Sequence, residues 1–544
     1  MFYFFIALII LLQLCQIHLI EYLCIYKQCE CESDYGFNYI TCHFNSNTLD
    51  MNPKFKLVDK KLNLIDTLTI KIGKNESIDL KIFTDLSINI LFMHETEIEN
   101  LRPGFFDGIQ SVKNIHLSNN KIEKLNFSIF DENFRQTVES IVLRNNSLYE
   151  IPEIIDLENL IYLDLSLNKI KVFKKLNTTE CPLESLDISS NLIENLSTRD
   201  DFSKKIKETL NELILNSNKI LKLEKFDNFT QLNKLGISYN KIKKLKSFTF
   251  QNLSTLNHLD LSHNQIELIE NEAFKSLNNL ALLDLSYNKI QIINKNIFMS
   301  LKNLEKLFLQ SNRLKHVEFY VFNTLTILHV LDLSRNQIEE IGLEGANNFT
   351  NLNLLRLSQN KLEDIDYDGL FERIPNILML YLENNYLIRI PTYFGNLIKL
   401  DMSSQNGRLT KLPNFAFKRF KTNVLLRFNL SDNVDLRFSN KTFCSRTNDT
   451  DLNYFMDLVM SPETLINTDK CVLKQLSYSH RRVRIFVEPE KIESYGIICD
   501  CKFRLFLAHY SILLKASCPR FKTYCSNVNF NDDCLTKNEF DCKY

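Results

Sequence analysis

The sequence is short of glycine and lacks tryptophan: 544 residues contain 11 glycines and no tryptophan. Glycine is therefore about 2% of the chain, against a usual share of about 7%. Phosphate-binding and dinucleotide-binding turns depend on clustered glycines, and the sequence contains no GxGxxG, GxxxxGK, GxSxG or HExxH motif. These absences argue against the corresponding enzyme classes. The formal net charge of −1 excludes a chain-wide electrostatic grip on nucleic acid.

Long apolar runs are scarce as well, and the clearest one opens the chain. It extends from Phe2 to Leu12, and the first charged residue is Glu21. This length predicts a secretory signal peptide over residues 1–20, cleaved between residues 16 and 22. The alternative is an uncleaved membrane anchor. No later stretch approaches 18 apolar residues, so we expect a secreted, extracellular protein with no membrane segment beyond the N-terminal signal.

The cysteines are distributed very unevenly. Apart from one in the signal region, they fall into two clusters separated by nearly 400 residues that contain only Cys181. The two even-numbered clusters predict disulfide-bonded ends. CxxC pairs are missing, so we expect no metal site, and Cys181 is predicted to be a buried free thiol. The clusters are Cys24, Cys29, Cys31 and Cys42, then Cys444, Cys471, Cys499, Cys501, Cys518, Cys525, Cys534 and Cys542.

The body between the clusters is periodic. Segments such as LNHLDLSHNQIELI and LALLDLSYNKIQII fit the pattern LxxLxLxxNx[IL], and from Asn240 to Asn360 the step is 24 residues five times running. Thr96 and Gln405 occupy the Asn position in imperfect copies, which gives about sixteen repeats. The Asn positions are Asn120, Asn146, Asn168, Asn191, Asn218, Asn240, Asn264, Asn288, Asn312, Asn336, Asn360 and Asn385, with a further one at Asn433.

This period and pattern predict a leucine-rich repeat solenoid. The two Leu of LxLxx alternate, so both point inward from a short parallel strand. The Asn side chain is expected to pair buried backbone groups of its own turn and of the neighbouring turn, so that its loss leaves groups unpaired at about 1–3 kcal/mol each. Phe250, Phe274, Phe298 and Phe322 recur ten residues after the Asn and predict a row of packed rings.

The chain resembles the extracellular leucine-rich repeat proteins of the typical 24-residue class. Residues 24–42, with spacing C-x4-C-x-C-x10-C, look like their N-terminal cap, and CDCKFRLFLAHYS with the Cys residues that follow looks like their C-terminal cap. The resemblance implies bonds from Cys499 to Cys518 and from Cys501 to Cys542, although Cys525 and Cys534 leave the pairing open. The expected fold is an α/β-type solenoid: a horseshoe of about sixteen repeats with a curved parallel sheet and disulfide-bonded caps. The expected segments are 1–20 signal peptide, 21–60 N-terminal Cys cap, 61–440 repeats, 441–498 irregular insertion and 499–544 C-terminal Cys cap.

Potential chemistry is confined to recurring polar positions. No catalytic constellation is present, and no cofactor is expected. Asp recurs between the two Leu of the strand motif, at Asp164, Asp187, Asp260, Asp284, Asp332 and Asp401. We interpret these carboxylates as solvated, partly hydrogen-bonded surface, with Ca²⁺ binding or acid–base work as the alternative.

Apolar residues at solvent-facing strand positions suggest a partner site. On a 24-residue repeat they are expected to line up as one patch on the concave face, which marks a contact with a protein ligand or receptor. The alternative is sequence drift under a glycan or loop. The predicted partner-binding residues are Leu282, Phe308, Val330, Leu354, Leu378, Met379, Tyr381 and Ile398.

A secreted, non-enzymatic recognition protein is the function that we expect, in adhesion, signalling or innate recognition. One alternative is a Toll-like or adhesion receptor ectodomain that lacks its membrane segment, and another is a non-catalytic regulatory subunit of a secreted complex. Eleven Asn-x-Ser/Thr sequons are consistent with a glycoprotein. The basic run at Lys241, Lys243, Lys244 and Lys246 is either a solvated turn or a binding site for sulfated glycan.

Overall fold

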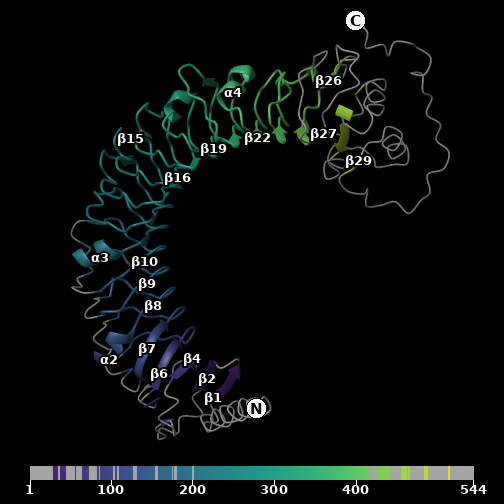
Figure 1. Cartoon of the computed structure of the whole chain (residues 1–544). Helices are drawn as coiled ribbons and strands as arrows, with labels where there is room; N and C mark the ends of the chain where they lie inside the picture. The colour runs from purple at the N-terminus through teal and green to yellow at the C-terminus, as the bar shows by residue number, and fades with distance from the viewer. Residues whose placement is uncertain are drawn as a thin grey trace, which may run out of the picture. The chain divides into compact units, whose positions relative to one another are not determined.

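The computed structural model of the chain falls into two compact units (Figure 1). Unit 1 comprises residues 1–265 and 272–278, and unit 2 comprises residues 266–271 and 279–544. The residues that the structure describes are 29–34, 37–44, 55–56, 64–72, 83–84, 86–101, 105–106, 109–125, 132–152, 157–173, 176, 181–198, 201–413, 416–417, 425–439, 442, 455–461, 464–465, 468, 483–487 and 513–514.

Short strands dominate both units, and the described helices are few. The helices are α2 (Glu132–Thr137), α3 (Lys204–Thr209), the 3₁₀ helix η3 (Phe319–Phe322) and α4 (Tyr367–Arg373). The strands of unit 1 are β1 (Cys29–Asp34), β2 (Phe37–Phe44), β3 (Phe55–Lys56), β4 (Leu64–Ile72), β5 (Phe83–Thr84), β6 (Leu86–Phe92), β7 (Ile109–His116), β8 (Ser140–Val142), β9 (Tyr162–Asp164), β10 (Ser185–Asp187), β11 (Glu212–Ile214), β12 (Lys234–Gly236), β13 (Lys244–Leu245) and β14 (His258–Asp260). The strands of unit 2 are β15 (Leu268–Ile269), β16 (Leu282–Asp284), β17 (Lys306–Phe308), β18 (His316–Glu318), β19 (Val330–Asp332), β20 (Glu340–Gly342), β21 (Leu354–Arg356), β22 (Met379–Tyr381), β23 (Lys399–Asp401), β24 (Lys411–Leu412), β25 (Leu425–Asn429), β26 (Arg437–Phe438), β27 (Phe455–Met460), β28 (Val483–Val487) and β29 (Leu513–Leu514).

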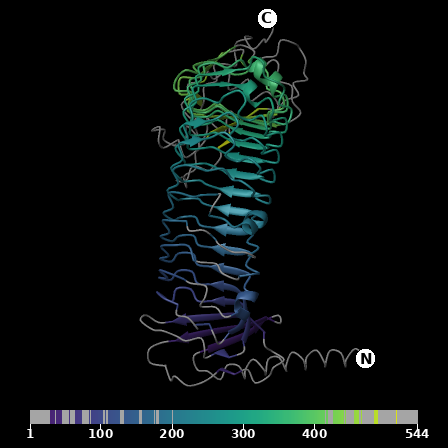
Figure 2. The same cartoon turned by 90° about the vertical axis from the view of Figure 1, so that its left-hand side faces the viewer.

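A parallel ladder of strands runs through unit 1. It begins with β1, which pairs antiparallel with β2 and places Cys29 opposite Cys42. The order that follows is β2, β4, β6, β7, β8, β9, β10, β11, β12 and β14, each parallel to the one before. Figure 2 shows the blue and teal arrows of this ladder lying side by side and pointing the same way. Helices α2 and α3 lie on the side of the unit away from β8 to β10 (Figure 1).

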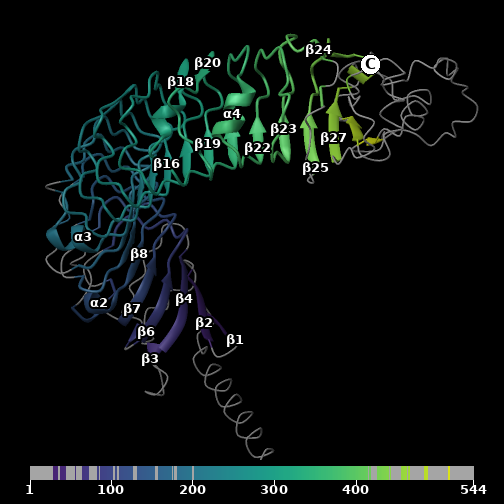
Figure 3. The ribbon, with the colours of Figure 1, turned by 45° about the horizontal axis from the view of Figure 1, so that its top comes forward.

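Unit 2 contains a ladder of the same kind, in the order β16, β17, β19, β21, β22, β23, β25, β27, β28 and β29 (Figure 3). Strands β27 and β28 lie in residues 441–498, the segment that the sequence predicts as an irregular insertion. In β27, Met456 and Leu458 are buried on either side of the half-exposed Asp457. This alternation suffices for a strand, but the repeat motif gave no signal for it. The two units hold about 14 turns, against the sixteen expected.

The core of each turn follows from the alternation of side chains. In β21, Leu355 is fully buried, whereas Leu354 and Arg356 on either side are half-buried. Leu357, two residues after Leu355, is buried as well. Each such leucine contributes about 1.5–3 kcal/mol through burial, and every turn depends on its neighbours to cover these side chains.

The side-chain amides at the Asn position of the repeat, which we call ladder amides, join successive turns. Asn336 Oδ1 accepts a hydrogen bond from the N–H of Leu314 at 3.1 Å, and its Nδ2 donates to the carbonyls of Leu309 and Leu333, both at 3.0 Å. Gln405 makes the equivalent contacts with Leu387 and Leu382. Bonds of this kind are made by Asn120, Asn146, Asn168, Asn191, Asn218, Asn240, Asn264, Asn288, Asn312, Asn336, Asn360 and Asn385.

The residue directly before each ladder amide has a left-handed backbone. Leu167, Tyr239, Arg335 and Gln359 all have φ of 54°. A side chain with a Cβ atom pays about 1–2 kcal/mol in this conformation. The strain is offset by the hydrogen bonds of the following ladder amide, because that amide closes the same turn.

Phenylalanine rings fill the space between turns. In unit 1, Phe250 stacks on Phe226 and on Phe274, with ring centroids 5.9 and 6.1 Å apart. In unit 2, Phe298 stacks on Phe322 at 6.0 Å. All five rings are almost completely buried, so the recurring Phe positions are packing positions.

Only some of the cysteines for which the sequence makes a prediction lie within the described residues. Cys42 is buried and disulfide-bonded, and only the backbone of Cys29 and Cys31 is described. Cys181 is a free buried thiol that donates to the Leu160 carbonyl at 3.5 Å, and burial raises its pKa to about 12. The signal peptide over residues 1–20 and the cap cysteines Cys24, Cys499, Cys501, Cys518 and Cys542 lie outside the described residues. Among the described residues, no helix combines the length and apolar character needed to cross a membrane.

Candidate functional site

The candidate site is the exposed side of the parallel ladder in unit 2, which we call strand face 2 (Figure 3). Side chains before and after the buried central residue of each strand point to solvent, and neighbouring strands lie about 4.8 Å apart. In-register pairing therefore forms two rows. The first row is Leu282, Lys306, Val330, Leu354, Met379, Lys399 and Arg427, and the second is Asp284, Phe308, Asp332, Arg356, Tyr381, Asp401 and Asn429.

Three predicted partner-binding residues are consecutive in the first row. Val330, Leu354 and Met379 lie side by side on β19, β21 and β22, and each is half-buried. Lys306 precedes them and Lys399 follows them in the same row. The result is a short apolar strip with a cation at each end.

The other predicted residues do not extend this strip. Lys306 separates Leu282 from Val330, and Phe308 lies between Asp284 and Asp332 in the second row. The predicted apolar positions are therefore interrupted along each row, and their role as a partner-binding site stays a prediction. The strict register places charged residues of intervening strands between apolar ones.

Tyr381 is an aromatic centre held by two cations. The Arg356 guanidinium lies 5.3 Å and the Lys399 ammonium 4.5 Å from the centroid of its ring. Arg356 also pairs with the buried carboxylate of Asp332 at 3.3 Å. Cation–π contacts of this kind fix the orientation of the ring, so Tyr381 presents a pre-positioned surface beside the apolar strip.

Leu378 and Ile398 belong to a groove of about 490 Å³ at the start of the strands. The N–H of Ile398 donates to the Leu378 carbonyl at 2.9 Å, so the two residues are neighbours. Amide side chains on the groove are fixed by backbone carbonyls: Asn376 donates to Thr350 at 2.8 Å, and Asn396 donates to Pro375 at 3.2 Å. The groove combines an apolar floor with fixed polar groups.

Glu383, two residues after Tyr381, is a partly buried acid. Burial raises its pKa, and the nearby Asp401 carboxylate raises it further, against the opposing effects of a Ser358 hydrogen bond and the Lys399 ammonium. Its Oε2 atom is buried and has no hydrogen-bond partner among the described residues. Binding of a donor at this atom would recover part of the cost of burial.

The recurring aspartates have a structural role. Asp284 Oδ1 accepts from the N–H of Ser286 at 2.8 Å, and Asp332 Oδ1 accepts from the N–H of Ser334 at 3.0 Å. The same bond, from the residue two positions later, occurs at the other four aspartates of the motif. Within the described residues, no group of three or more His, Cys, Asp or Glu is placed to hold a metal ion.

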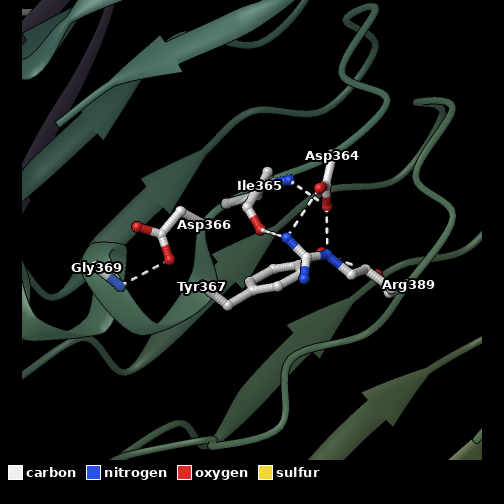
Figure 4. A network of polar contacts seen from close by, with 6 residues as sticks. All are labelled: Asp364, Ile365, Asp366, Tyr367, Gly369 and Arg389. Atoms are coloured by element: carbon white, nitrogen blue, oxygen red, sulfur yellow. Dashed lines mark hydrogen bonds and ion pairs between the residues drawn. The ribbon is translucent and has the colours of Figure 1, made fainter.

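A separate polar cluster fastens α4 to the next turn (Figure 4). Arg389 donates to both carboxylate oxygens of Asp364, with Nη2–Oδ2 at 2.8 Å, and to the Ile365 carbonyl at 3.2 Å. The buried Tyr367 hydroxyl donates to the Arg389 carbonyl at 3.2 Å, and burial raises the pKa of this hydroxyl. The polar groups of this cluster are hydrogen-bonded to one another, so the role of the cluster is to stabilise the attachment of α4 to the next turn.

The charged members of strand face 2 were not among the predicted site residues, because only apolar residues at the exposed strand positions were taken as candidates. Lys306, Arg356, Lys399 and Arg427 occupy the same two rows. The LxxLxLxxN frame already assigns them to the exposed positions, so the signal was present.

Comparison with known proteins agrees with this architecture. The family model described as leucine rich repeat matches residues 208–266, 230–290, 264–314, 302–362 and 326–387. A protein phosphatase 1 regulatory inhibitor subunit homologue of Arabidopsis thaliana is 28% identical over 106 residues, which are 20% of this chain and 31% of that protein. The match thus spans about a third of the length of the curated relative.

A solved structure shares the fold, and a second is less similar. A chain in the structure of the Drosophila Toll–Spatzle complex superposes with a TM-score of 0.59 at 16% identity, covering 92% of this chain and 73% of that chain. A leucine-rich repeat protein of Leptospira interrogans gives a TM-score of 0.45 at 21% identity, covering 59% of this chain and 85% of that one. The parallel ladders and the ladder amides form a leucine-rich repeat solenoid, and the leucine rich repeat model matches residues 208–387 within it.

Proposed function

We propose that this chain is a secreted, non-enzymatic recognition protein that binds a protein partner on strand face 2. The observation that carries the proposal is the apolar strip of Val330, Leu354 and Met379, bounded by Lys306 and Lys399. Apolar side chains that lie together and are partly exposed, with a charged rim, are typical of the centre of a protein interface.

The surroundings of the strip support binding rather than catalysis. Tyr381 and Arg356 are of the residue types that dominate interface energetics, and here they are held in contact. From β16 to β25 the ladder extends over about 30 Å at about 4.8 Å per strand. That length accommodates a partner of ordinary interface size, about 800 Å² per side.

Site-specific photo-crosslinking tests the proposal. A photoreactive residue at Met379 in the full chain, exposed to extract of the source tissue, is expected to give a discrete protein adduct. The same residue at Met299, an exposed methionine of unit 2 outside strand face 2, is the matched control. The adduct should disappear with Leu354→Glu and persist with Ile292→Glu, at another exposed apolar position. Equal adducts at Met379 and Met299, or an adduct indifferent to Leu354→Glu, would count against strand face 2.

Two related functions use the same surface. The Arabidopsis relative is named as a regulatory inhibitor subunit, which favours, as an alternative, a non-catalytic subunit of a larger complex. The other alternative is a receptor ectodomain. Detergent-phase partition and apparent mass of the native protein separate the cases. A soluble species of mature mass plus glycans supports secretion, and a heavier detergent-phase species supports a receptor.

A further inference from the structure

Positive charge is concentrated in one stretch of unit 1. Residues 219–246 contain eight lysines and two acidic residues, a formal charge of about +6 (8 − 2), within a chain of net charge −1. We call Lys219, Lys222, Lys241, Lys243, Lys244 and Lys246 the Lys cluster. They follow the ladder amides Asn218 and Asn240 in two successive turns.

The alternation of buried and exposed residues directs these side chains outward. Ile242 and Leu245 are fully buried, whereas Lys241, Lys243 and Lys246 between and beside them are exposed. The N–H of Lys241 donates to the carbonyl of Ile220 in the preceding turn at 2.9 Å. This bond places the lysines of the two turns next to each other.

At three other turns, the lysine after the ladder amide is neutralised by a glutamate of the neighbouring turn, whereas Lys169 donates to the Ser147 hydroxyl. Lys121 pairs with Glu97 at 3.3 Å in unit 1. In unit 2, Lys289 pairs with Glu267 at 3.8 Å, and Lys361 pairs with Glu339 at 3.9 Å. The glutamate lies one or three residues after the amide position of the preceding turn.

Four lysines of the Lys cluster lack this neutralisation. The positions of the preceding turn that would hold a glutamate for Lys241 are Lys219 and Leu221. Within the part of the chain that the structure describes, Lys222, Lys241, Lys243 and Lys246 form no ion pair with a carboxylate. Glu224, an acid of the same stretch, accepts instead from the Ser197 hydroxyl at 3.0 Å. Ammonium groups on neighbouring turns, whose backbones lie about 4.8 Å apart, repel one another, and a bound polyanion relieves that repulsion.

The residues around the Lys cluster favour a polysaccharide over a single-stranded nucleic acid as the polyanion. Recognition of single-stranded nucleic acid relies on open aromatic faces interleaved with cations. Lys225 and Lys275 cover the Phe248 ring, with ammonium groups 5.8 and 4.9 Å from its centroid. Tyr239 is 56% exposed but has one face stacked on His263, with centroids 4.0 Å apart, so that face is closed to a base. Lysine also supplies compact point charges rather than a planar fork, which suits sulfate groups spaced along a flexible chain.

We infer that the Lys cluster of unit 1 binds a linear sulfated polysaccharide, at a surface separate from strand face 2. The interaction rests on ion pairing, so the affinity falls with salt by about 0.7–0.9 logarithmic units per neutralised contact for each tenfold increase in salt. Whether the Lys cluster binds the polysaccharide does not depend on whether strand face 2 binds a protein partner.

The test measures binding of the full chain to immobilised heparin across a salt series. The variant is Lys222→Gln, Lys241→Gln, Lys243→Gln and Lys246→Gln together. We expect at least tenfold weaker binding and a salt slope smaller by about 3, from four lost contacts at about 0.7 each. The matched control carries the same substitution at four exposed lysines of unit 2, Lys295, Lys302, Lys315 and Lys411, and is expected to bind within twofold of the parent.

Two further arms complete the design. Replacing the four cluster lysines by arginine keeps the charge and is expected to keep heparin binding, and circular dichroism melting checks that each variant folds. Desulfated heparin, hyaluronan and a duplex DNA serve as competing polyanions. Unchanged heparin binding by the glutamine variant overturns the inference, as does equal affinity for desulfated heparin. Tighter binding of the DNA than of heparin reassigns the Lys cluster to nucleic acid.

Discussion

Asn336 and Leu309 are joined across a turn boundary by a hydrogen bond of 3.0 Å, from the buried side-chain amide to the backbone carbonyl. The same side chain serves Leu314 and Leu333. One residue therefore supplies pairing for three backbone groups in a region that water does not reach.

Replacing Asn336 by Ala is expected to destabilise unit 2 by several kcal/mol, at about 1–3 kcal/mol for each group left unpaired. Urea unfolding followed by circular dichroism measures the change. Asn296→Ala, at an exposed asparagine of the same unit, should stay within about 0.5 kcal/mol of the parent. Similar losses from both substitutions would show that the ladder amides are not the source of the stability.

Phe298 and Met299 are adjacent in sequence and opposite in environment. Phe298 is 1% exposed and stacked on Phe322, whereas Met299 is 56% exposed. Phe298→Ala is expected to cost about 3–5 kcal/mol through loss of burial and the resulting cavity, and Met299→Ala about 0.5 kcal/mol or less. Thermal unfolding of the two variants measures the difference. A cost for Phe298→Ala no larger than that for Met299→Ala would contradict the packing role of the Phe row.

Glu383 should make unit 2 sensitive to pH. Its pKa lies above the ordinary value of 4.5 because burial disfavours the charged form. Folding therefore favours the neutral acid, and this contribution is present below the unfolded pKa and lost as pH rises through the folded pKa.

Glu383→Gln is accordingly expected to be more stable than the parent at pH 7, by about 1 kcal/mol or less because the partial exposure of the site screens the charge. The gain should vanish near pH 4. Urea titrations at both pH values measure it, with the exposed Glu344→Gln as control for the loss of one charge. A larger gain at pH 4 than at pH 7 would reverse the assigned sign.

Cys181 should resist alkylation in the folded chain. Burial raises its pKa from 9.0 to about 12, which lowers the thiolate fraction near neutral pH about a thousandfold. Mass spectrometry of the peptide containing Cys181 after iodoacetamide treatment is expected to show modification only after denaturation. Rapid native labelling at this position would mean that the thiol is accessible. Cys181→Ser, which keeps a donor for the Leu160 carbonyl, should fold.

The sequence predicted the repeat frame because the frame is local and redundant. Each turn contains the Leu spacing and the Asn position of the repeat, so the sequence alone assigned Gln405 to the amide position. In the structure Gln405 makes the amide contacts there. Strands β27 and β28 were not predicted, because their alternation carries no Asn and no fixed spacing. Parallel pairing in this segment depends on which strand lies next to it, which is not a local property.

The sequence predicted which residues lie at exposed strand positions of the site, but not whether the apolar ones are neighbours along a row. The frame placed Val330, Leu354 and Met379 on exposed strand positions, and their register makes them neighbours. It did not show that Lys306 and Asp332 interrupt the apolar residues, because that depends on in-register contact between strands rather than on each repeat alone. The contacts of Tyr381 with two cations arise from side-chain geometry and had no sequence signal of their own.

The left-handed residue before each ladder amide has a consequence for how this chain can change in length. Leu167, Tyr239 and Arg335 hold that conformation because the following amide is fixed by the adjacent turn. A single residue inserted or deleted between the strand and the ladder amide would move a different side chain into the left-handed slot and shift the amide off its carbonyls. Removal of a whole 24-residue period between Asn240 and Asn360 keeps both in place. Length variation should therefore fall in the connections outside the strand and its amide, where the step already varies from 22 residues (Asn146 to Asn168) to 27 (Asn191 to Asn218), or take the form of whole turns.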